Sequence, residues 1–237
     1  MADVIPAPEP PRLQVRGGGT FPVRRIHCVG RNFADHAREM GAQAPASREA
    51  RGRPVFFSKP ADALVLDGRV PHPPATKELH HEVELVAAIG RDPGPGVLDP
   101  ADAQGLVFGY AIGLDLTRRD LQAQAKAGGL PWDIAKGFDH SAPVSELVRA
   151  AEAGDLESRT LSLEVNGSLR QSSQLGRMIW NVAEILHELS QLYRLRAGDL
   201  VFMGTPAGVA ALEPGDRCTA RLDDLLRLDC AILPPLT

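Results

Sequence analysis

The chain has 237 residues, of which 43% are hydrophobic and 24% are charged, and its formal net charge is −4. This length suits one large globular domain, and the weak negative charge excludes a general attraction to nucleic acid. Three scattered cysteines argue against a disulfide framework and favour a reducing cytoplasm. No apolar run approaches the ~20 residues of a membrane span, and the N-terminal sequence lacks the pattern of a signal peptide.

The N-terminal part of the chain changes character near residue 23. Residues 1–22 are rich in proline and glycine, which predicts an extended and weakly structured arm. A single domain is predicted over 23–237. It begins with a strand over 25–30 and a helix over 32–40. The small, polar and basic stretch 42–54 then predicts a mobile loop.

The middle of the chain is dominated by apolar segments that predict strands. These segments are 55–57, 82–89 and 107–115. Asp99 and Pro100 are typical of a helix start and predict a short helix over 101–105. Thr117, followed by Asp120, is predicted to cap a helix that ends at Gly128-Gly129.

The last third combines a hairpin, a helix and several short strands. Alternating apolar residues over 161–165 lead into Asn166-Gly167, a strong signal for a tight hairpin. Apolar spacing over 179–192 predicts an amphipathic helix, with Asn181 and Glu184 as its capping box. Short strands separated by turns then follow over 198–233. Many strands and few helices predict an α+β fold built around curled, mixed β-sheet.

Two carboxylates stand two residues apart in the strand over 82–89. Glu82 and Glu84 therefore face the same side, where bare neighbouring carboxylates would repel each other unless a cation binds them. Asp115 ends another apolar strand and supplies a third carboxylate. The alternatives are a solvent-facing strand surface for the pair and a helix cap for Asp115. Carboxylates without thiolates favour Mg²⁺, Mn²⁺ or Ca²⁺ over zinc, and we expect His80 and His81 to support the site rather than bind metal.

A second candidate pair is His36 with Glu39. Their i, i+3 spacing places them on one helical face, where the carboxylate can orient the imidazole and raise its basicity. Such a pair can take a proton from water, although exposed pairs of this kind are also common.

Cations and a tight loop complete the candidate site. They are Lys59, Lys136, Arg119 beside Gln122, and the loop Gly204-Thr205-Pro206-Ala207-Gly208, which can cradle a carboxylate or be a plain turn.

These motifs together, in this order and spacing, resemble the fumarylacetoacetate hydrolase family. The resemblance runs from about residue 23 to the C-terminus. The matching segments are Val29-Gly30-Arg31-Asn32-Phe33-Ala34-Asp35-His36-Ala37-Arg38-Glu39-Met40, Phe57-Ser58-Lys59-Pro60, His80-His81-Glu82-Val83-Glu84-Leu85, Leu114-Asp115-Leu116-Thr117-Arg118-Arg119-Asp120, Pro131-Trp132 to Lys136, and Gly204-Thr205-Pro206. The chain looks most similar to the small single-domain branch, close to bacterial fumarylpyruvate hydrolases of gentisate-type aromatic degradation. Phe33 stands where the family pattern has Tyr.

The resemblance implies a sandwich-like roll of curled sheets with a few peripheral helices, usually as a homodimer. It implies a Mg²⁺ ion, with Mn²⁺ or Ca²⁺ as substitutes, on Glu82, Glu84 and Asp115. It implies that His36 and Glu39 lie on a lid helix and act as the base, with Lys136 as a further catalytic residue. The side chains implied to contact a small 2-keto acid substrate are Arg31, Lys59, Arg119, Gln122 and Thr205.

The implied reaction is metal-dependent hydrolysis of a carbon–carbon bond in an acylpyruvate, here fumarylpyruvate. Water activated by the dyad attacks the distal carbonyl, and a pyruvate enolate leaves. Oxaloacetate decarboxylation needs the same enolate stabilisation but no attacking water, and an isomerase or dehydratase acting on a 2-keto acid is a related alternative. A non-catalytic metal-binding β-domain is the alternative from another class, and it would have no use for the dyad.

Overall fold

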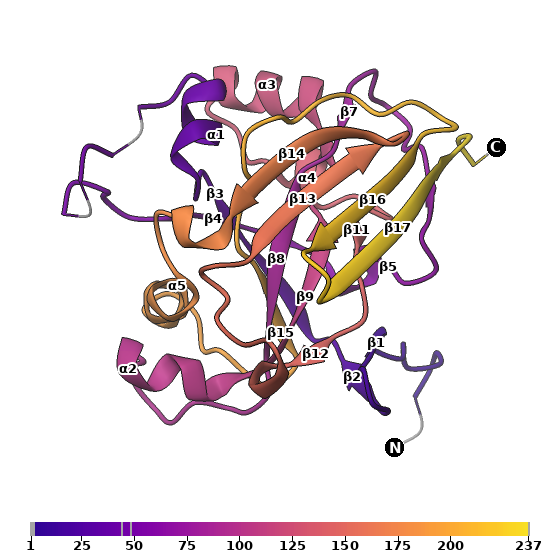
Figure 1. The fold of residues 1–237 in the computed structure, drawn as a ribbon. Helices are drawn as coiled ribbons and strands as arrows, with labels where there is room; N and C mark the ends of the chain where they lie inside the picture. Colours follow the sequence, from indigo (N-terminus) through magenta and orange to yellow (C-terminus); the bar gives the residue numbers. More distant parts are fainter. Residues whose placement is uncertain (1–2, 44, 48, 237) are drawn as a thin grey trace.

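Two β-sheets form the frame of the molecule and share one large hydrophobic core (Figure 1). The computed structural model describes residues 3–43, 45–47 and 49–236. In this part of the chain, the larger sheet has the order β12-β9-β8-β15-β3-β4 and the second sheet β14-β13-β16-β17-β6. The strands of the larger sheet are β3 (Arg25–Gly30), β4 (Val55–Lys59), β8 (Val83–Ile89), β9 (Val107–Leu114), β12 (Val148–Arg149) and β15 (Asp199–Phe202). Those of the second sheet are β6 (Arg69–Pro71), β13 (Thr160–Val165), β14 (Ser168–Gln174), β16 (Arg217–Leu222) and β17 (Leu226–Leu233).

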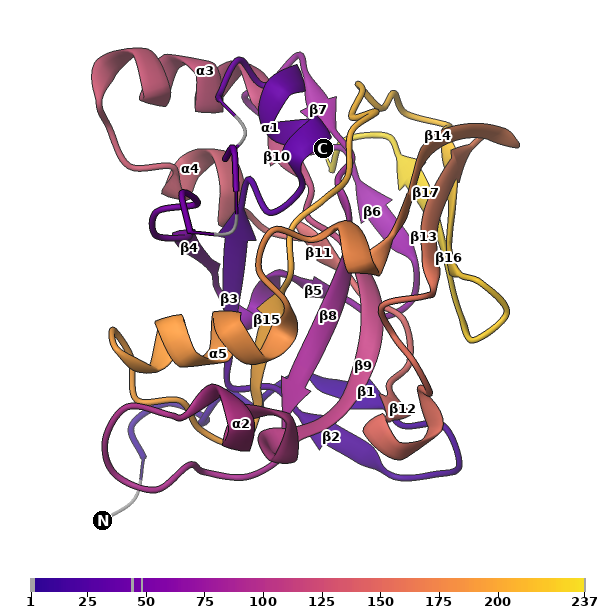
Figure 2. The same ribbon diagram turned by 60° about the vertical axis from the view of Figure 1, so that its left-hand side comes forward.

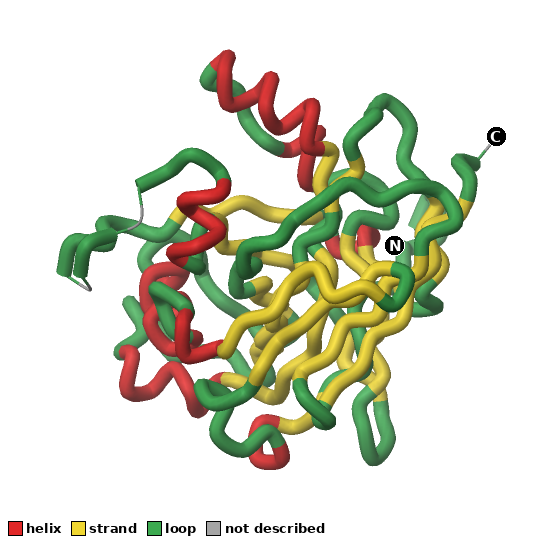
Figure 3. Tube along the Cα trace, turned by 45° about the horizontal axis from the view of Figure 1, so that its top comes forward, coloured by secondary structure: helices red, strands yellow, loops and turns green. Residues whose placement is uncertain are grey.

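Short strand pairs and helices surround this frame, and Figure 3 shows the helices at the periphery of the strands. The short pairs are β1 (Arg12–Gln14) with β2 (Thr20–Pro22), β5 (Leu64–Val65) with β11 (Ala142–Pro143), and β7 (Leu79–His80) with β10 (Thr117–Arg118). The α-helices are α1 (Ala34–Glu39), α2 (Pro100–Ala103), α3 (Arg119–Gly128), α4 (Asp133–Lys136) and α5 (Val182–Ser190). The 3₁₀ turns are η1 (Ala61–Ala63), η2 (Gln104–Leu106), η3 (Ala150–Glu152) and η4 (Leu175–Arg177). No helix of the described chain is long and apolar enough to cross a membrane.

The central strand β8 is buried on both faces. Leu85 and Ile89 belong to the large core shared with the second sheet, whereas Val86 and Ala88 belong to a smaller cluster on the other side. Because side chains alternate along a strand, the near-continuous apolar sequence of β8 is what this double burial requires. β15 runs parallel to β3 and antiparallel to β8, so the sheet is mixed. The predicted α+β class with curled, mixed sheets is confirmed.

Turns and helix caps that depend only on neighbouring residues lie where the sequence predicts them. The Asn181 side chain accepts from the Glu184 amide, and the Glu184 side chain accepts from the Asn181 amide, which is the predicted capping box. The helix it starts is shorter than the predicted 179–192. Asn166 and Gly167 have φ values of 53° and 77°, as a two-residue hairpin turn requires. Asp99 accepts from the Ala101 amide and caps α2, as predicted.

Two predictions of helix starts differ from the structure. Thr117 does not cap a helix, because it pairs with His80 in the β7–β10 ladder and its hydroxyl donates to the Asp115 carbonyl. The helix that follows begins at Arg119 without a side-chain cap. The predicted helix over 32–40 is confined to α1, since Asn32 is occupied by contacts to distant segments. The predicted loop over 42–54 has no regular structure where it is described. Residues 44 and 48 lie outside the described residues.

The predicted N-terminal arm is more ordered than its composition suggests. β1 and β2 pair across Gly17, Gly18 and Gly19, all with positive φ, and Leu13 and Phe21 are buried in the smaller cluster. The alternation of apolar residues around the glycine turn explains this hairpin. Residues 1–2 lie outside the described part, and the division into an arm and one domain stays a prediction.

α1, α3 and α4 gather at one end of β3 and β8, whereas α2 and α5 lie toward the opposite end (Figure 2). Beneath α1, α3 and α4 lie three strand ends, which are the carboxyl end of β3, the start of β8 and the end of β9. This arrangement brings the segments that carry the candidate site residues together.

Candidate active site

Three buried carboxylates gather where β8 and β9 meet. Glu84 lies in β8, Glu82 directly precedes it, and Asp115 directly follows β9. The antiparallel register pairs Val83 with Leu114, and the Asp115 amide donates to the Glu82 carbonyl over 2.8 Å. One oxygen of each side chain lies within 4.8 Å of the others, and each residue is at most 4% exposed. The three predicted metal ligands therefore form one cluster.

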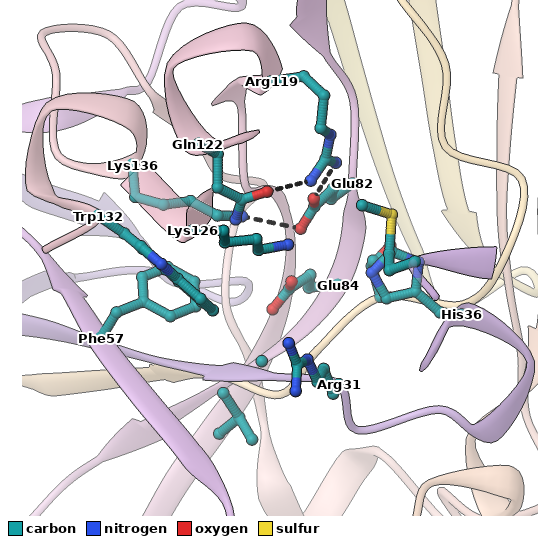
Figure 4. A pocket seen from close by; sticks show the side chains of 14 residues that line it. Arg31, His36, Phe57, Glu82, Glu84, Arg119, Gln122, Lys126, Trp132 and Lys136 are labelled. Carbon is teal, nitrogen blue, oxygen red and sulfur yellow. Dashed lines mark hydrogen bonds and ion pairs between the residues drawn. The ribbon is translucent and has the colours of Figure 1, made fainter. Parts of the chain in front are cut away.

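Cationic side chains surround this carboxylate cluster (Figure 4). Lys136 Nζ donates to Asp115 Oδ2 over 2.5 Å and to Glu82 Oε2 over 2.9 Å. Arg119 donates to the other oxygen of Glu82, and Lys59 Nζ lies 2.8 Å from Asp115 Oδ1. Although burial alone would raise the pKa of Glu82, Lys136 and Arg119 lower it below its usual range. Burial likewise opposes the charge of Lys136, but Asp115 and Glu82 raise its pKa.

Glu84 has no cation at ion-pair distance among the described residues. Its Oε2 instead accepts from the Gly204 amide over 2.7 Å. Gly204 has a φ of 89°, and a Cβ there would come within 2.7 Å of Asn32 Cβ, so only glycine brings this amide so close. Burial raises the pKa of Glu84 well above its usual value, and the carboxylates of Asp115 and Glu82 raise it further.

The dyad predicted on the helix exists. His36 Nδ1 lies 3.1 Å from Glu39 Oε2, and the other Glu39 oxygen accepts from the Gly208 amide over 3.0 Å. His36 is 5% exposed and lines the same pocket as Glu82 and Glu84. The Glu39 carboxylate thus orients the ring through Nδ1, and Nε2 is the ring nitrogen that can take up a proton.

Residues 25–232 match the family model described as fumarylacetoacetate (FAA) hydrolase C-terminal. The chain belongs to this family. The predicted enzyme class, a hydrolase that acts on carbon–carbon bonds, agrees with this membership.

Relatives within the family carry more than one activity name. A fumarylpyruvate hydrolase of Ralstonia sp is 41% identical over 193 residues, which cover 77% of this chain and 98% of the relative. The oxaloacetate tautomerase YcgM of Escherichia coli (strain K12) is 41% identical over 209 residues, which cover 86% and 90%. The crystal structure of a fumarylpyruvate hydrolase from Pseudomonas aeruginosa in complex with Mn²⁺ and pyruvate has a TM-score of 0.91, 43% identity, and covers 98% of this chain and all of that one.

The carboxylate cluster fits a hard divalent cation. Asp115 Oδ1 is buried and lies 2.8 Å from Lys59 Nζ, but it accepts no well-aligned hydrogen bond from the described residues. Glu84 is buried beside two further carboxylates, and a divalent cation would remove both the repulsion and the cost of burying its charge. Oxygen donors without thiolates match the preferences of Mg²⁺ and Mn²⁺. Glu82, Glu84 and Asp115 are therefore the residues that could hold the cation.

The structure places most predicted substrate contacts around the pocket, but not Lys59. Arg31, Arg119, Gln122 and Thr205 line it. Thr205 Oγ1 accepts from Gln171 Nε2 over 2.8 Å, and Gln122 accepts from Arg119 over 2.6 Å.

Lys59 supports the site rather than facing its pocket. Lys59 is not among the described residues that line the pocket. Besides its contact with Asp115, its ammonium group donates to the carbonyls of Leu116 and Lys136. This contact with Asp115 joins the last residue of β4 to the residue that follows β9, and no local pattern reveals it.

The two neighbouring histidines lie beside the carboxylates, as expected of supporting residues. Arg119 Nε contacts His80 Nδ1 at 3.4 Å, and burial, with Arg119, lowers the pKa of His80 to about 4. His81 Nδ1 lies 3.0 Å from Gln171 Oε1, which also accepts from the Val83 amide. Gln171 thereby ties His81 to the loop that carries Thr205.

Sequence reasoning missed further residues that line the pocket. They are Val29, Gly30, Met40, Phe57, Lys126 and Trp132. The spacing of Lys126, four residues after Gln122, was a usable signal, because it places both side chains on one helical face.

Proposed function

We propose that the chain is a divalent-metal-dependent acylpyruvate hydrolase that cleaves fumarylpyruvate to fumarate and pyruvate. The observation that carries this proposal is the position of the His36–Glu39 dyad and of Glu82 and Glu84 around one pocket. A non-catalytic metal-binding domain has no need of a buried base beside its carboxylates. The proposed cation is Mg²⁺, with Mn²⁺ or Ca²⁺ as substitutes, because the donor set is oxygen only.

In the proposed reaction, His36 takes a proton from water while Glu39 fixes its tautomer. The water oxygen bonds to the distal carbonyl carbon, the bond from that carbon to the methylene carbon breaks, and its electron pair passes to the pyruvate fragment as an enolate. A divalent cation held by the carboxylate cluster would polarise the pyruvoyl oxygens when bound. In this proposal, Lys136 stabilises the negative charge of the enolate, which then takes up a proton to give pyruvate.

The proposal includes a lid from about residue 33 to residue 53, of which residues 44 and 48 lie outside the described part of the chain. The pocket leaves about 30 Å³ of free volume, room for about two water molecules, so an acylpyruvate cannot enter unless a wall moves. The Gly208 amide holds Glu39, and the Arg51 guanidinium donates to Glu184 over 2.8 Å. Arg51 also lies 3.7 Å from the centre of the Trp180 ring. These contacts hold the segment against the body and must loosen when it opens.

Oxaloacetate is the second candidate substrate, to be decarboxylated or isomerised. The relative named as an oxaloacetate tautomerase supports it, since it is as similar to this chain as the fumarylpyruvate hydrolase of Ralstonia sp is. Metal-assisted stabilisation of an enolate serves both substrates, whereas water activation serves hydrolysis alone. The dyad therefore favours the acylpyruvate.

The proposal also keeps the predicted homodimer, the cytoplasmic location and a role in aromatic compound degradation.

A kinetic screen tests the proposed substrate directly. The enzyme is assayed with Mg²⁺ on fumarylpyruvate, acetylpyruvate and oxaloacetate, and we expect the highest kcat/KM on fumarylpyruvate. An enzyme that converts oxaloacetate and ignores both acylpyruvates would promote the second candidate.

A further inference from the structure

Lys126 lines the pocket but has no part in the reaction outlined above. It follows Arg119 and Gln122 along one face of α3, one turn (~5.4 Å) farther from the start of the helix than Gln122. Its Nζ lies 5.2 Å from the centre of the Trp132 ring and makes no ion pair with a carboxylate of the described chain. Figure 4 shows its ammonium group pointing into the space in front of Glu84.

Arg31 supplies a second cation to the same space (Figure 4). It has a φ of 62°, a left-handed conformation that is strained for a residue with a side chain. Its neighbour Asn32 holds this turn, because the buried Asn32 side chain donates to the carbonyls of Trp180 and Met203 and accepts from the Trp180 amide. The hydrogen bonds of Asn32 therefore hold Arg31 in this strained backbone conformation, in which the Arg31 side chain points toward the pocket.

Lys126 and Arg31 are in excess over the negative charge of the site. The cluster of three carboxylates already has ion pairs from Lys136, Arg119 and Lys59. Burial lowers the pKa of Lys126, and the positive charges of Arg119 and Arg31 lower it further. Two cations that repel each other, both facing a pocket, are typical of a site that binds an anion. Neither residue belongs to the lid, which begins near residue 33.

We propose that Lys126 and Arg31 form a second anion subsite, which binds the carboxylate at the acyl end of a dicarboxylic acylpyruvate. This inference rests on the proposed function and narrows it to substrates with two carboxylates. The pyruvoyl end lies by Glu82 and Arg119, and the acyl chain runs along α3 toward Lys126. Because the subsite recognises only the second carboxylate, it determines specificity rather than the chemical step.

The test compares two substrates that differ in that carboxylate. Fumarylpyruvate has it and acetylpyruvate lacks it. Lys126→Met should lower kcat/KM for fumarylpyruvate about 10–100-fold, as expected for a lost charge-assisted hydrogen bond, and change that for acetylpyruvate less than about threefold. Lys126→Arg keeps the charge and should restore most of the activity on fumarylpyruvate. Lys77→Met removes an exposed lysine elsewhere and serves as the control.

The outcomes separate this inference from the proposed function. Equal losses on both substrates would mean that Lys126 serves the shared pyruvoyl end, and this would overturn the subsite alone. Unchanged kinetics of Lys126→Met on fumarylpyruvate would overturn it as well. A wild-type enzyme that cleaves neither substrate would instead overturn the proposed function, together with the subsite. Circular dichroism of each variant shows whether it is folded, and Arg31→Met should repeat the selective loss.

Discussion

Replacing Glu84 with glutamine should have opposite effects on stability in the absence and presence of the cation. Two charged carboxylates at 4.8 Å, the upper limit of the oxygen separations in this cluster, would repel by about 3.5 kcal/mol at an effective dielectric constant of about 20. Glutamine removes this repulsion and the cost of burying a charge, and it keeps an oxygen for the Gly204 amide. Lost attraction to Lys136 offsets part of the gain. We therefore expect Glu84→Gln to raise the free energy of unfolding by about 1–2 kcal/mol in a chelator.

With Mg²⁺ present the order should reverse. A cation at about 100 times its Kd stabilises the wild-type protein by about 2.7 kcal/mol, which raises the Tm by about 5–10 °C for a chain of this size. Mg²⁺ should add almost no stability to Glu84→Gln. The control Glu213→Gln, at an exposed residue, should be stabilised by Mg²⁺ as much as wild type is. Differential scanning calorimetry with EDTA and then with excess MgCl₂ measures both effects. A variant that is less stable than wild type in EDTA and still gains with Mg²⁺ would refute this reasoning.

Two further predictions concern pH and the lid. His27 is buried without a hydrogen bond from the described residues, and burial lowers its pKa to about 4. The unfolded chain therefore takes up this proton first, and stability is lost as the pH falls from 6.5 toward 4, by about 2 kcal/mol at pH 5. Urea unfolding of wild type and His27→Phe at pH 8 and pH 5 checks this, since equal losses in both would exclude His27 as the cause. For the lid, we expect hydrogen exchange over residues 33–43 to slow when oxalate binds and to quicken in Arg51→Met. Equal protection with and without oxalate would count against lid motion.

Features encoded by neighbouring residues could be predicted, and those that depend on distant pairing could not. The capping box at Asn181 and the turn at Asn166-Gly167 need only local geometry. The cluster of Glu82, Glu84 and Asp115 was within reach because alternation puts two carboxylates on one face and the end of an apolar strand supplies the third.

Other parts of the site had no local signal. Lys59 is predicted to contact substrate, but its ammonium group lies against Asp115, which is distant in the sequence. The Gly204 amide reaches Glu84 only because β15 inserts between β3 and β8. The N-terminal segment shows the opposite case, since its proline and glycine content hides an alternation of apolar residues that forms the β1–β2 hairpin.

The most direct test of the central claim is the ratio of two activities in His36→Ala. Both wild type and variant are assayed with saturating Mg²⁺ for fumarylpyruvate hydrolysis and for oxaloacetate decarboxylation, and Lys136→Met serves as the comparison. Loss of the base should lower hydrolysis by about 10²–10⁴-fold and decarboxylation far less, whereas Lys136→Met should depress both together. A His36→Ala enzyme that still hydrolyses fumarylpyruvate near the wild-type rate would contradict the account.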